Sequence, residues 1–324
     1  MKSLLRPICA ATLLTFAIVA AARADDPKPA EAKKTFRVLL RERWKVGDVV
    51  TRIAKETSTR NVEAKKGDEP VQKLPGSERQ TSYVTVTKCL EANADGYPTK
   101  SLLYLTSWSI EAGPQRDASL TGVHIELTGL GAERTWKILT PDAKPSAVAI
   151  DWVDQFYGKK AAGDATYNDL EPKGEVEVGA SWEGESRSIA KRLADRGLPV
   201  DVEKSKAVCT LHSVDDGKAH LEVKMSFPTT ELKLPGQSFP WKEGGVLELT
   251  LDITRPLAAG EFDARMHREQ KLAGIAQGDD GVTVTWEDMG QQDIEFKAGG
   301  KMPEVPATPI EGDKKEPAMD DAPR

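Results

Sequence analysis

Apolar and polar residues alternate with a period of two along most of the chain, a pattern typical of strands that bury one face. The stretch GGVLELTLDIT has apolar residues at the odd positions from 247 to 253, which we expect to face a core. TGVHIELTG repeats this at 123–127, with His124 and Glu126 pointing outward, and DGVTVTWED places Val282, Val284 and Trp286 on one face. Short turns separate such stretches, and parallel strands need long crossover connections. The sequence therefore predicts a mostly β, antiparallel fold.

Three landmarks occur twice in the same order, which indicates a tandem duplication. WKVGDVV around Gly47 matches VEVGASW around Gly179, TVTKCLEANADG matches SKAVCTLHSVDDG, and TGVHIELT matches GGVLELTL. The stretch at 62–78 is then an insertion in the first half. We predict two antiparallel β domains, sandwich-like or half-barrel-like, at 36–140 and 174–298, which should superpose with Cys89 and Cys209 on corresponding hairpins.

A linker at 141–173 joins these halves and contains one predicted helix. Pro145 and Ser146 are start signals and Gly158 is a stop signal. The apolar stripe between them consists of Val148, Ile150, Trp152, Val153, Phe156 and Tyr157. This stripe predicts a helix from 145 to 158 that packs on a sheet. Residues 186–199 are compatible with a second short helix, whereas the comparable TRIAKETSTR of the first half is equally compatible with a strand.

The two ends of the chain differ from its body. Residues 1–24 have a basic start, an apolar run at 8–22 that includes Cys9, and small residues before a cleavage point between Ala24 and Asp25, which predicts a secretory signal peptide. No later segment is apolar enough to span a bilayer. We expect a periplasmic or secreted protein. Residues 25–35 and 299–324 are rich in Pro, Ala and charge, so we predict that both are disordered.

The charge of the chain argues against nucleic acid as a partner. The formal net charge is −6, and removal of residues 1–24 takes away three basic residues and no acid, which makes it more negative. Binding to phosphates needs a basic footprint. An unknown protein or an apolar ligand is the partner class that remains.

The stretch HSVDDGKAH places two histidines around a turn. A three-residue loop at 215–217 pairs Leu211 with Leu221, whereas a two-residue loop at 216–217 opposes Leu211 to Glu222 and buries charge. The first register is favoured, and it sets His212 directly opposite His220 on the outer face, close enough to share a metal. Two imidazoles are only half of a tetrahedral zinc shell. We therefore interpret them as an exposed polar pair and predict no metal and no cofactor.

Cys89 and Cys209 are the cysteines that remain after the signal. An even number in an oxidising compartment favours a disulfide, but Cys209 lies in the apolar face of its strand, and free cysteine is among the most buried residue types. We expect two buried thiols.

Motifs for catalysis are scarce. The sequence contains no metalloprotease, nucleophile-elbow or phosphate-loop pattern. SIAK matches Ser-x-x-Lys with Ser188 and Lys191, but the companion motifs of that enzyme class are missing. A non-catalytic protein is favoured, with no catalytic residue assigned.

The order of an export signal, a WKVGD opening, a central linker, an EVEVGASW restart and a charged tail resembles a family of uncharacterised secreted bacterial proteins of about 300 residues. This resemblance implies an exported protein with two similar β-rich halves. It implies no activity and no site residues.

Three functional hypotheses follow. The first is a non-catalytic binding or scaffold protein, and its alternative is an envelope carrier of a lipid or other apolar ligand, with the Trp152 helix as a lid. A hydrolase that uses Ser188 and Lys191 is the least favoured. One large apolar pocket with a few polar groups favours the carrier, and two filled cores favour the scaffold.

Overall fold

A computed structural model of the chain describes residues 34–158, 167–195, 197–234, 237–278 and 281–306. Its elements, in chain order, are β1 (Thr35–Phe36), β2 (Val49–Lys66), β3 (Gln72–Ala92), β4 (Pro98–Ala112), β5 (Gln115–Asp117), β6 (His124–Thr128), the 3-10 turn η1 (Gly131–Glu133), β7 (Thr135–Ile138), α1 (Ala147–Tyr157), β8 (Val176–Glu177), β9 (Ser181–Glu183), α3 (Ser186–Asp195), β10 (Lys206–Asp215), β11 (Lys218–Pro228), β12 (Glu231–Leu234), β13 (Gln237–Pro256), β14 (Ala264–Gln277) and β15 (Val282–Ala298). The predicted signal peptide, its cleavage point and Cys9 lie outside the described residues.

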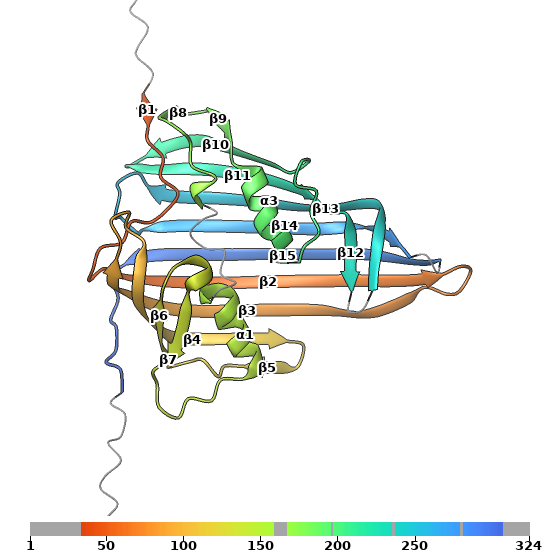
Figure 1. Ribbon diagram of the computed structural model, residues 1–324, viewed down its shortest axis with the longest axis horizontal. Helices are drawn as coiled ribbons and strands as arrows, with labels where there is room; N and C mark the ends of the chain where they lie inside the picture. Colours follow the sequence, from red (N-terminus) through yellow and green to blue (C-terminus); the bar gives the residue numbers. More distant parts are fainter. Residues whose placement is uncertain (1–33, 159–166, 196, 235–236, 279–280, 307–324) are drawn as a thin grey trace, which may run out of the picture. The chain divides into compact units, whose positions relative to one another are not determined.

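Most of the described strands belong to one antiparallel sheet (Figure 1). Its order is β7-β6-β4-β3-β2-β15-β14-β13-β11-β10-β9, with β5 on β4 and β12 on β13, while the short β1 and β8 pair separately. The predicted mostly β, antiparallel fold is confirmed.

The two predicted halves share this sheet and do not form separate β domains. Strand β15 pairs with β2 along its whole length, from Val282 opposite Lys66 to Ala298 opposite Val50. An edge strand exposes a row of unpaired N–H and C=O groups, and each half covers the edge of the other. This long-range pairing is what the sequence analysis missed.

Each half keeps the same meander order, β2-β3-β4-β6-β7 in the first and β9-β10-β11-β13-β14-β15 in the second. The opening glycines also behave alike. Gly47 donates its N–H to Cys89 O at 2.9 Å, and Gly179 donates to Leu211 O at 2.7 Å. Both glycines have positive φ, at 93° and 86°. Cys89 therefore corresponds to Leu211 in this comparison, two residues beyond Cys209 on the same strand face. Descent from a duplication stays a prediction.

Helix α1 confirms the helix predicted between Pro145 and Gly158. The Ser146 hydroxyl accepts a hydrogen bond from the N–H of Ala149 and caps the first turn. Trp152 is 2% exposed, and its ring lies 5.0 Å from that of Tyr83 and 5.7 Å from that of Trp108. These contacts fix the helix on the first half of the sheet.

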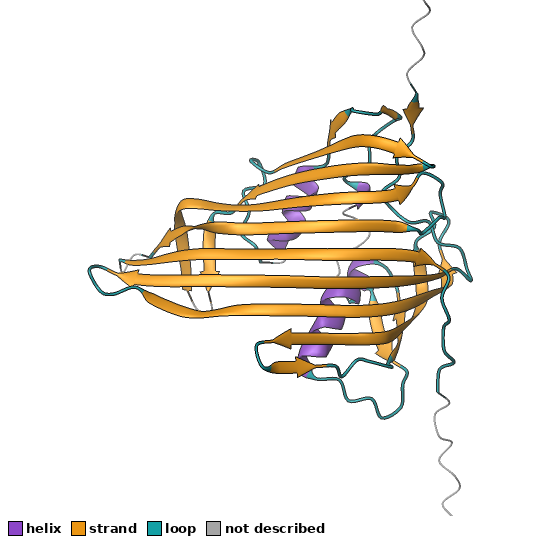
Figure 2. Cartoon of the chain, turned by 180° about the vertical axis from the view of Figure 1, so that it is seen from behind, coloured by secondary structure: helices purple, strands orange, loops and turns teal. Residues whose placement is uncertain are grey.

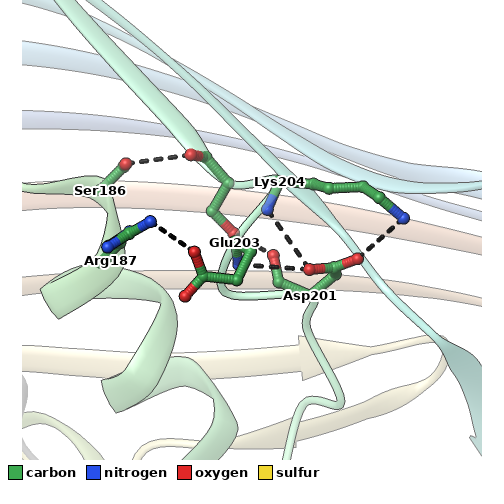
Figure 3. Close-up of polar contacts among 6 residues, drawn as sticks. Ser186, Arg187, Asp201, Glu203 and Lys204 are labelled. Carbon is green, nitrogen blue, oxygen red and sulfur yellow. Dashed lines mark hydrogen bonds and ion pairs between the residues drawn. The ribbon is translucent and has the colours of Figure 1, made fainter.

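The stretch from 186 forms helix α3, while its first-half counterpart lies in strand β2. Polar contacts hold the first turn of α3 to the turn at 201–205 (Figure 3): the Ser186 hydroxyl donates to Ser205 O at 2.9 Å, and Arg187 pairs with Glu203. Asp201 in turn accepts from the N–H of Lys204 at 3.3 Å. Both helices lie on one face of the sheet (Figures 1 and 2).

The histidine hairpin corrects one prediction. Leu211 pairs with Leu221 as expected, but the loop is the two-residue turn Asp216-Gly217, because Asp215 pairs with Lys218. Both turn residues have positive φ, as tight hairpin turns require. A bulge between Leu211 and Ser213 absorbs the difference in register. Ser213, not His212, therefore faces His220.

Two predictions at the ends of the chain are also corrected. Residues 299–306, expected to be part of a disordered tail, lie against the sheet, where Gly299 donates its N–H to Val49 O at 2.6 Å. Pro303 O lies 3.2 Å from His124 Nε2. His124, predicted to be on the outer face, is consequently covered by this segment and only 2% exposed. At the other end, Thr35, expected to be in the disordered 25–35 segment, pairs with Glu177.

Cys89 and Cys209 are free and buried, as predicted. Burial raises the pKa of the Cys209 thiol to about 12, and burial together with Asp48 raises that of Cys89. Neither thiol therefore has the depressed pKa of a reactive cysteine.

Candidate functional site

A cavity of about 460 Å³ lies between the sheet and the two helices. The sheet contributes apolar side chains from β11, β13, β14 and β15. They are Met225, Leu249, Leu251, Ile253, Met266, Ile294 and Phe296. Three of the four odd positions of β13 predicted to face inward, Leu249, Leu251 and Ile253, thus line this cavity. Alternation along a strand sends every second side chain to the same face, which is why neighbouring strands build one continuous apolar wall.

The helices form the opposite wall. Phe156 and Tyr157 come from the last turn of α1, and Ile189 and Leu193 lie one turn apart on α3. Residues four apart share a helix face. Trp152 does not line the cavity; it packs in the core beneath α1. Its role is to anchor this helix.

The segment before β2 completes the wall and is held by two charged side chains, the buried Arg255 and the half-buried Glu171. Arg255, 7% exposed, donates to Leu40 O, and its second terminal nitrogen donates to Arg41 O at 3.1 Å. Glu171 accepts from the N–H groups of the same two residues, at 2.8 and 3.1 Å. Burial lowers the pKa of Arg255, and Glu42 opposes this effect. Arg255 thus serves to position Leu40 and Arg41 at the cavity.

The polar part of the wall is strongly basic. Glu42 is its acidic residue. Seven arginines line it: Arg41, Arg52, Arg134, Arg192, Arg255, Arg265 and Arg268. Several have partners within the chain. Arg192 pairs with Asp169, Arg265 with Glu295, and Arg268 with Glu56.

Arg52 differs from these arginines. Its guanidinium lies 5.3 Å from the ring centre of Tyr83 and 5.5 Å from that of Phe296. Among the described residues it makes no hydrogen bond or ion pair, and its Nε is buried without a partner. An arginine remains protonated in a protein. The cavity therefore contains a positive charge to which no described carboxylate hydrogen-bonds.

A second hollow, of about 570 Å³, lies over the same strands on the opposite face, and its lining mixes charged residues and histidines with apolar side chains. It contains His212, His220 and His267. His267 Nδ1 lies 2.7 Å from Asp293, and hydrogen bonding to this carboxylate raises the pKa of His267. In the part of the chain that the structure describes, no group of three or more His, Cys, Asp and Glu is arranged to hold a metal. His267 lies on strand β14 and comes beside the predicted pair, His212 and His220, only because the sheet brings these strands together.

Ser188 and Lys191 do not form a nucleophile and base pair. The Ser188 hydroxyl accepts a hydrogen bond from Arg192 at 2.8 Å, Lys191 is exposed, and no hydrogen bond joins Ser188 to Lys191 among the described contacts. Within the described ranges, no helix is both long and apolar enough to cross a bilayer.

The sequence predicted no ligand-binding residue. Strand alternation indicates that one face of the sheet is apolar, but it does not show whether the space against that face is filled by side chains.

No family model and no curated protein matches the chain. Among solved structures, one of lipovitellin, concerned with lipid–protein interactions, matches with a TM-score of 0.36 and 9% identity over 81% of this chain and 26% of lipovitellin. The attachment invasion locus protein Ail of Yersinia pestis matches at 0.11 and 8% over 77% of this chain and 99% of Ail. A Pseudomonas aeruginosa FadL homologue matches at 0.17 and 5% over 77% and 89%. The chain spans about a quarter of lipovitellin. TM-scores this low do not establish a shared fold with any of the three proteins.

Proposed function

We propose that this protein carries an apolar or amphipathic small molecule in the cavity between its sheet and its helices. The observation that supports this is the composition of the wall, in which apolar side chains from both the sheet and the helices face one shared space. A scaffold protein of the same fold needs no such space, because its helices pack directly on the sheet.

The size and chemistry of the cavity fit a small ligand. Ligand sites typically have volumes of about 300 to 1,000 Å³, mostly apolar walls and a few polar groups that fix orientation. A cavity of about 460 Å³ lies within this range, and arginines supply the polar groups. The hollow on the opposite face is larger, but charged residues and histidines divide its apolar side chains, and helices α1 and α3 do not cover it.

The proposal extends to location. The signal-like residues 1–24 support export, and an exported carrier would work in the cell envelope or outside the cell, where a water-insoluble molecule needs shielding during transfer. Apolar burial contributes roughly 25 cal/mol for each Å² removed from water, which is the free energy available for holding such a ligand.

Native mass spectrometry of gently purified protein tests the proposal directly. We expect a bound small molecule that is lost on denaturation. The uncharged dye N-phenyl-1-naphthylamine should also bind, with enhanced fluorescence, because it needs only an apolar site.

A matched pair of variants locates the site. Leu249→Trp places an indole in the cavity, whereas Glu248→Trp adds the same ring to the exposed opposite face of β13. We expect the first to weaken dye binding by about tenfold or more, a loss of about 1.4 kcal/mol, and the second to leave it unchanged. If neither dye nor co-purified ligand binds the wild-type protein, the carrier proposal is wrong and the scaffold hypothesis stands.

A further inference from the structure

We propose that the ligand is an anionic amphiphile, and that Arg52 binds its carboxylate or phosphate head group. This inference rests on the carrier function proposed above and adds the chemistry of the ligand. The observation behind it is a guanidinium that lines an apolar cavity without an anion to pair with.

Arg52 projects from the face of β2 that carries the cavity, beside its cross-strand partner Phe296 on β15. Ile294 lies two residues along β15 on the same face and also lines the cavity. The charge and the apolar wall therefore adjoin. An amphiphile with its head group at Arg52 would place its first methylene groups against these two side chains.

The rings of Tyr83 and Phe296 hold the guanidinium in place but leave its terminal N–H groups unused. Contact with ring faces attracts the guanidinium, but it does not satisfy the five N–H donors of an arginine. Arg52 also lines a smaller cavity of about 140 Å³ together with Tyr157 and Phe296. The guanidinium thus lies where two spaces meet, with room for the oxygens of a head group.

Arg60, on the same strand, shows what a purely structural arginine looks like in this protein. It too lies over an aromatic ring, 4.8 Å from the centre of Trp286, but its guanidinium donates two hydrogen bonds to Asp288 at 3.0 and 2.7 Å. Arg52 has the ring contacts and lacks the carboxylate. A ligand oxyanion would supply the missing acceptor, and arginine matches carboxylate and phosphate oxygens with two parallel hydrogen bonds.

The remaining charges of the wall do not cancel this site. Glu42 acts electrostatically on Arg52, and it has an interaction of its own within the chain. Arg41 lies in the same wall and binds the Tyr97 hydroxyl. Arg192, Arg265 and Arg268 are neutralised by their own carboxylate partners. The guanidinium of Arg52 has no such partner among the described residues, which favours an anion over a neutral or cationic head group.

Competition against N-phenyl-1-naphthylamine at about pH 7.5, where a carboxyl group is ionised, tests the inference. Four ligands share the dodecyl chain length and differ in head group: dodecanoate, dodecyl phosphate, dodecanol and dodecyltrimethylammonium. Because a hydrogen bond to a charged group contributes about 1.5–3 kcal/mol, we expect at least one anion to bind about tenfold or more tighter than dodecanol, and the cation to bind weakest. The ratio of dodecanoate to dodecyl phosphate distinguishes a fatty acid from a phosphorylated lipid.

Arg52→Gln should abolish the preference for anions and leave the affinity for dodecanol within about twofold, whereas Arg60→Gln should keep the preference. Equal affinity for the anions and dodecanol in the wild-type protein, or an undiminished preference in Arg52→Gln, overturns the inference while the carrier function survives. If Arg52→Gln does not fold, the head-group ranking of the wild-type protein and Arg52→Lys, expected to retain part of the preference, still decide. Failure of the dye and all four ligands to bind counts instead against the carrier function itself.

Discussion

The two faces of strands β13, β14 and β15 carry opposite chemistry on the same backbone. On the face that bears the helices, Leu251 and Met266 line an apolar cavity with Ile294. One residue away along each of these strands, Asp252 and His267 line a polar hollow on the other face together with Asp293. The volumes are similar, about 460 and 570 Å³, so size does not distinguish the two sites.

The two sites differ in whether helices cover them. Helices α1 and α3 lie over only one face (Figures 1 and 2), and a charge without a partner is costly only where water is excluded. On the open face the histidines and acids pair with one another or with solvent. On the covered face Arg52 is half-buried, its Nε is buried without a partner, and no described carboxylate hydrogen-bonds to it. The covered face is therefore the one that we propose binds a ligand anion.

Removal of the anchor of the cover should have the largest effect. Trp152→Ala deletes a ring that packs against Tyr83 and Trp108, and truncation of a buried aromatic side chain costs about 3–5 kcal/mol. We expect this loss in the free energy of unfolding measured by urea denaturation. Ile150→Ala, on the exposed side of the same helix at 43% exposure, should change it by about 0.5 kcal/mol or less. Equal effects of the two substitutions would show that α1 does not cover the sheet as described.

The buried arginine of the cavity wall should have the next largest effect. Arg255→Met removes the donors to Leu40 O and Arg41 O and leaves two carbonyls unpaired, which should lower the free energy of unfolding by about 2–3 kcal/mol. Amide hydrogen exchange of residues 38–42 should become faster as well. Arg265→Met, which removes an arginine that is 78% exposed and paired with Glu295, should cost about 1 kcal/mol or less. Unchanged exchange in Arg255→Met would contradict the positioning role.

The open face should show the smallest effect, and it should depend on pH. The hydrogen bond to Asp293 raises the pKa of His267 above its ordinary value, so protonated His267 stabilises the fold. This contribution is fully present below the unfolded pKa of about 6.5 and is lost as pH rises through the higher folded pKa. An NMR titration of His267 should give a midpoint above that of Asp293→Asn. Equal midpoints in the wild-type protein and in Asp293→Asn would show that the hydrogen bond between His267 and Asp293 does not form.

Local signals explain the elements that were predicted correctly. Ser146 and Gly158 bound helix α1 because a cap and a stop act within a few residues. The apolar pairing of Leu211 with Leu221 follows from alternation. The position of His212 does not follow from local signals. Asp216-Gly217 favours a two-residue turn, whereas the apolar alternation favours the register that pairs Leu211 with Leu221. Only the assembled sheet shows that a bulge between Leu211 and Ser213 accommodates both.

The sequence by itself determined the β class, the antiparallel pairing within each half, the inward face of β13 and the burial of both cysteines, since each depends on residues close in the chain or on side-chain polarity. Tertiary structure alone decided that β15 joins β2 in one sheet, that residues 299–306 cover His124, and that Arg52 from β2 meets Phe296 from β15 beside an apolar cavity. The physical reason is distance along the chain: a contact between residues that lie far apart in the sequence leaves no periodic trace in either segment, and an empty space between two apolar faces has the same sequence pattern as a filled one.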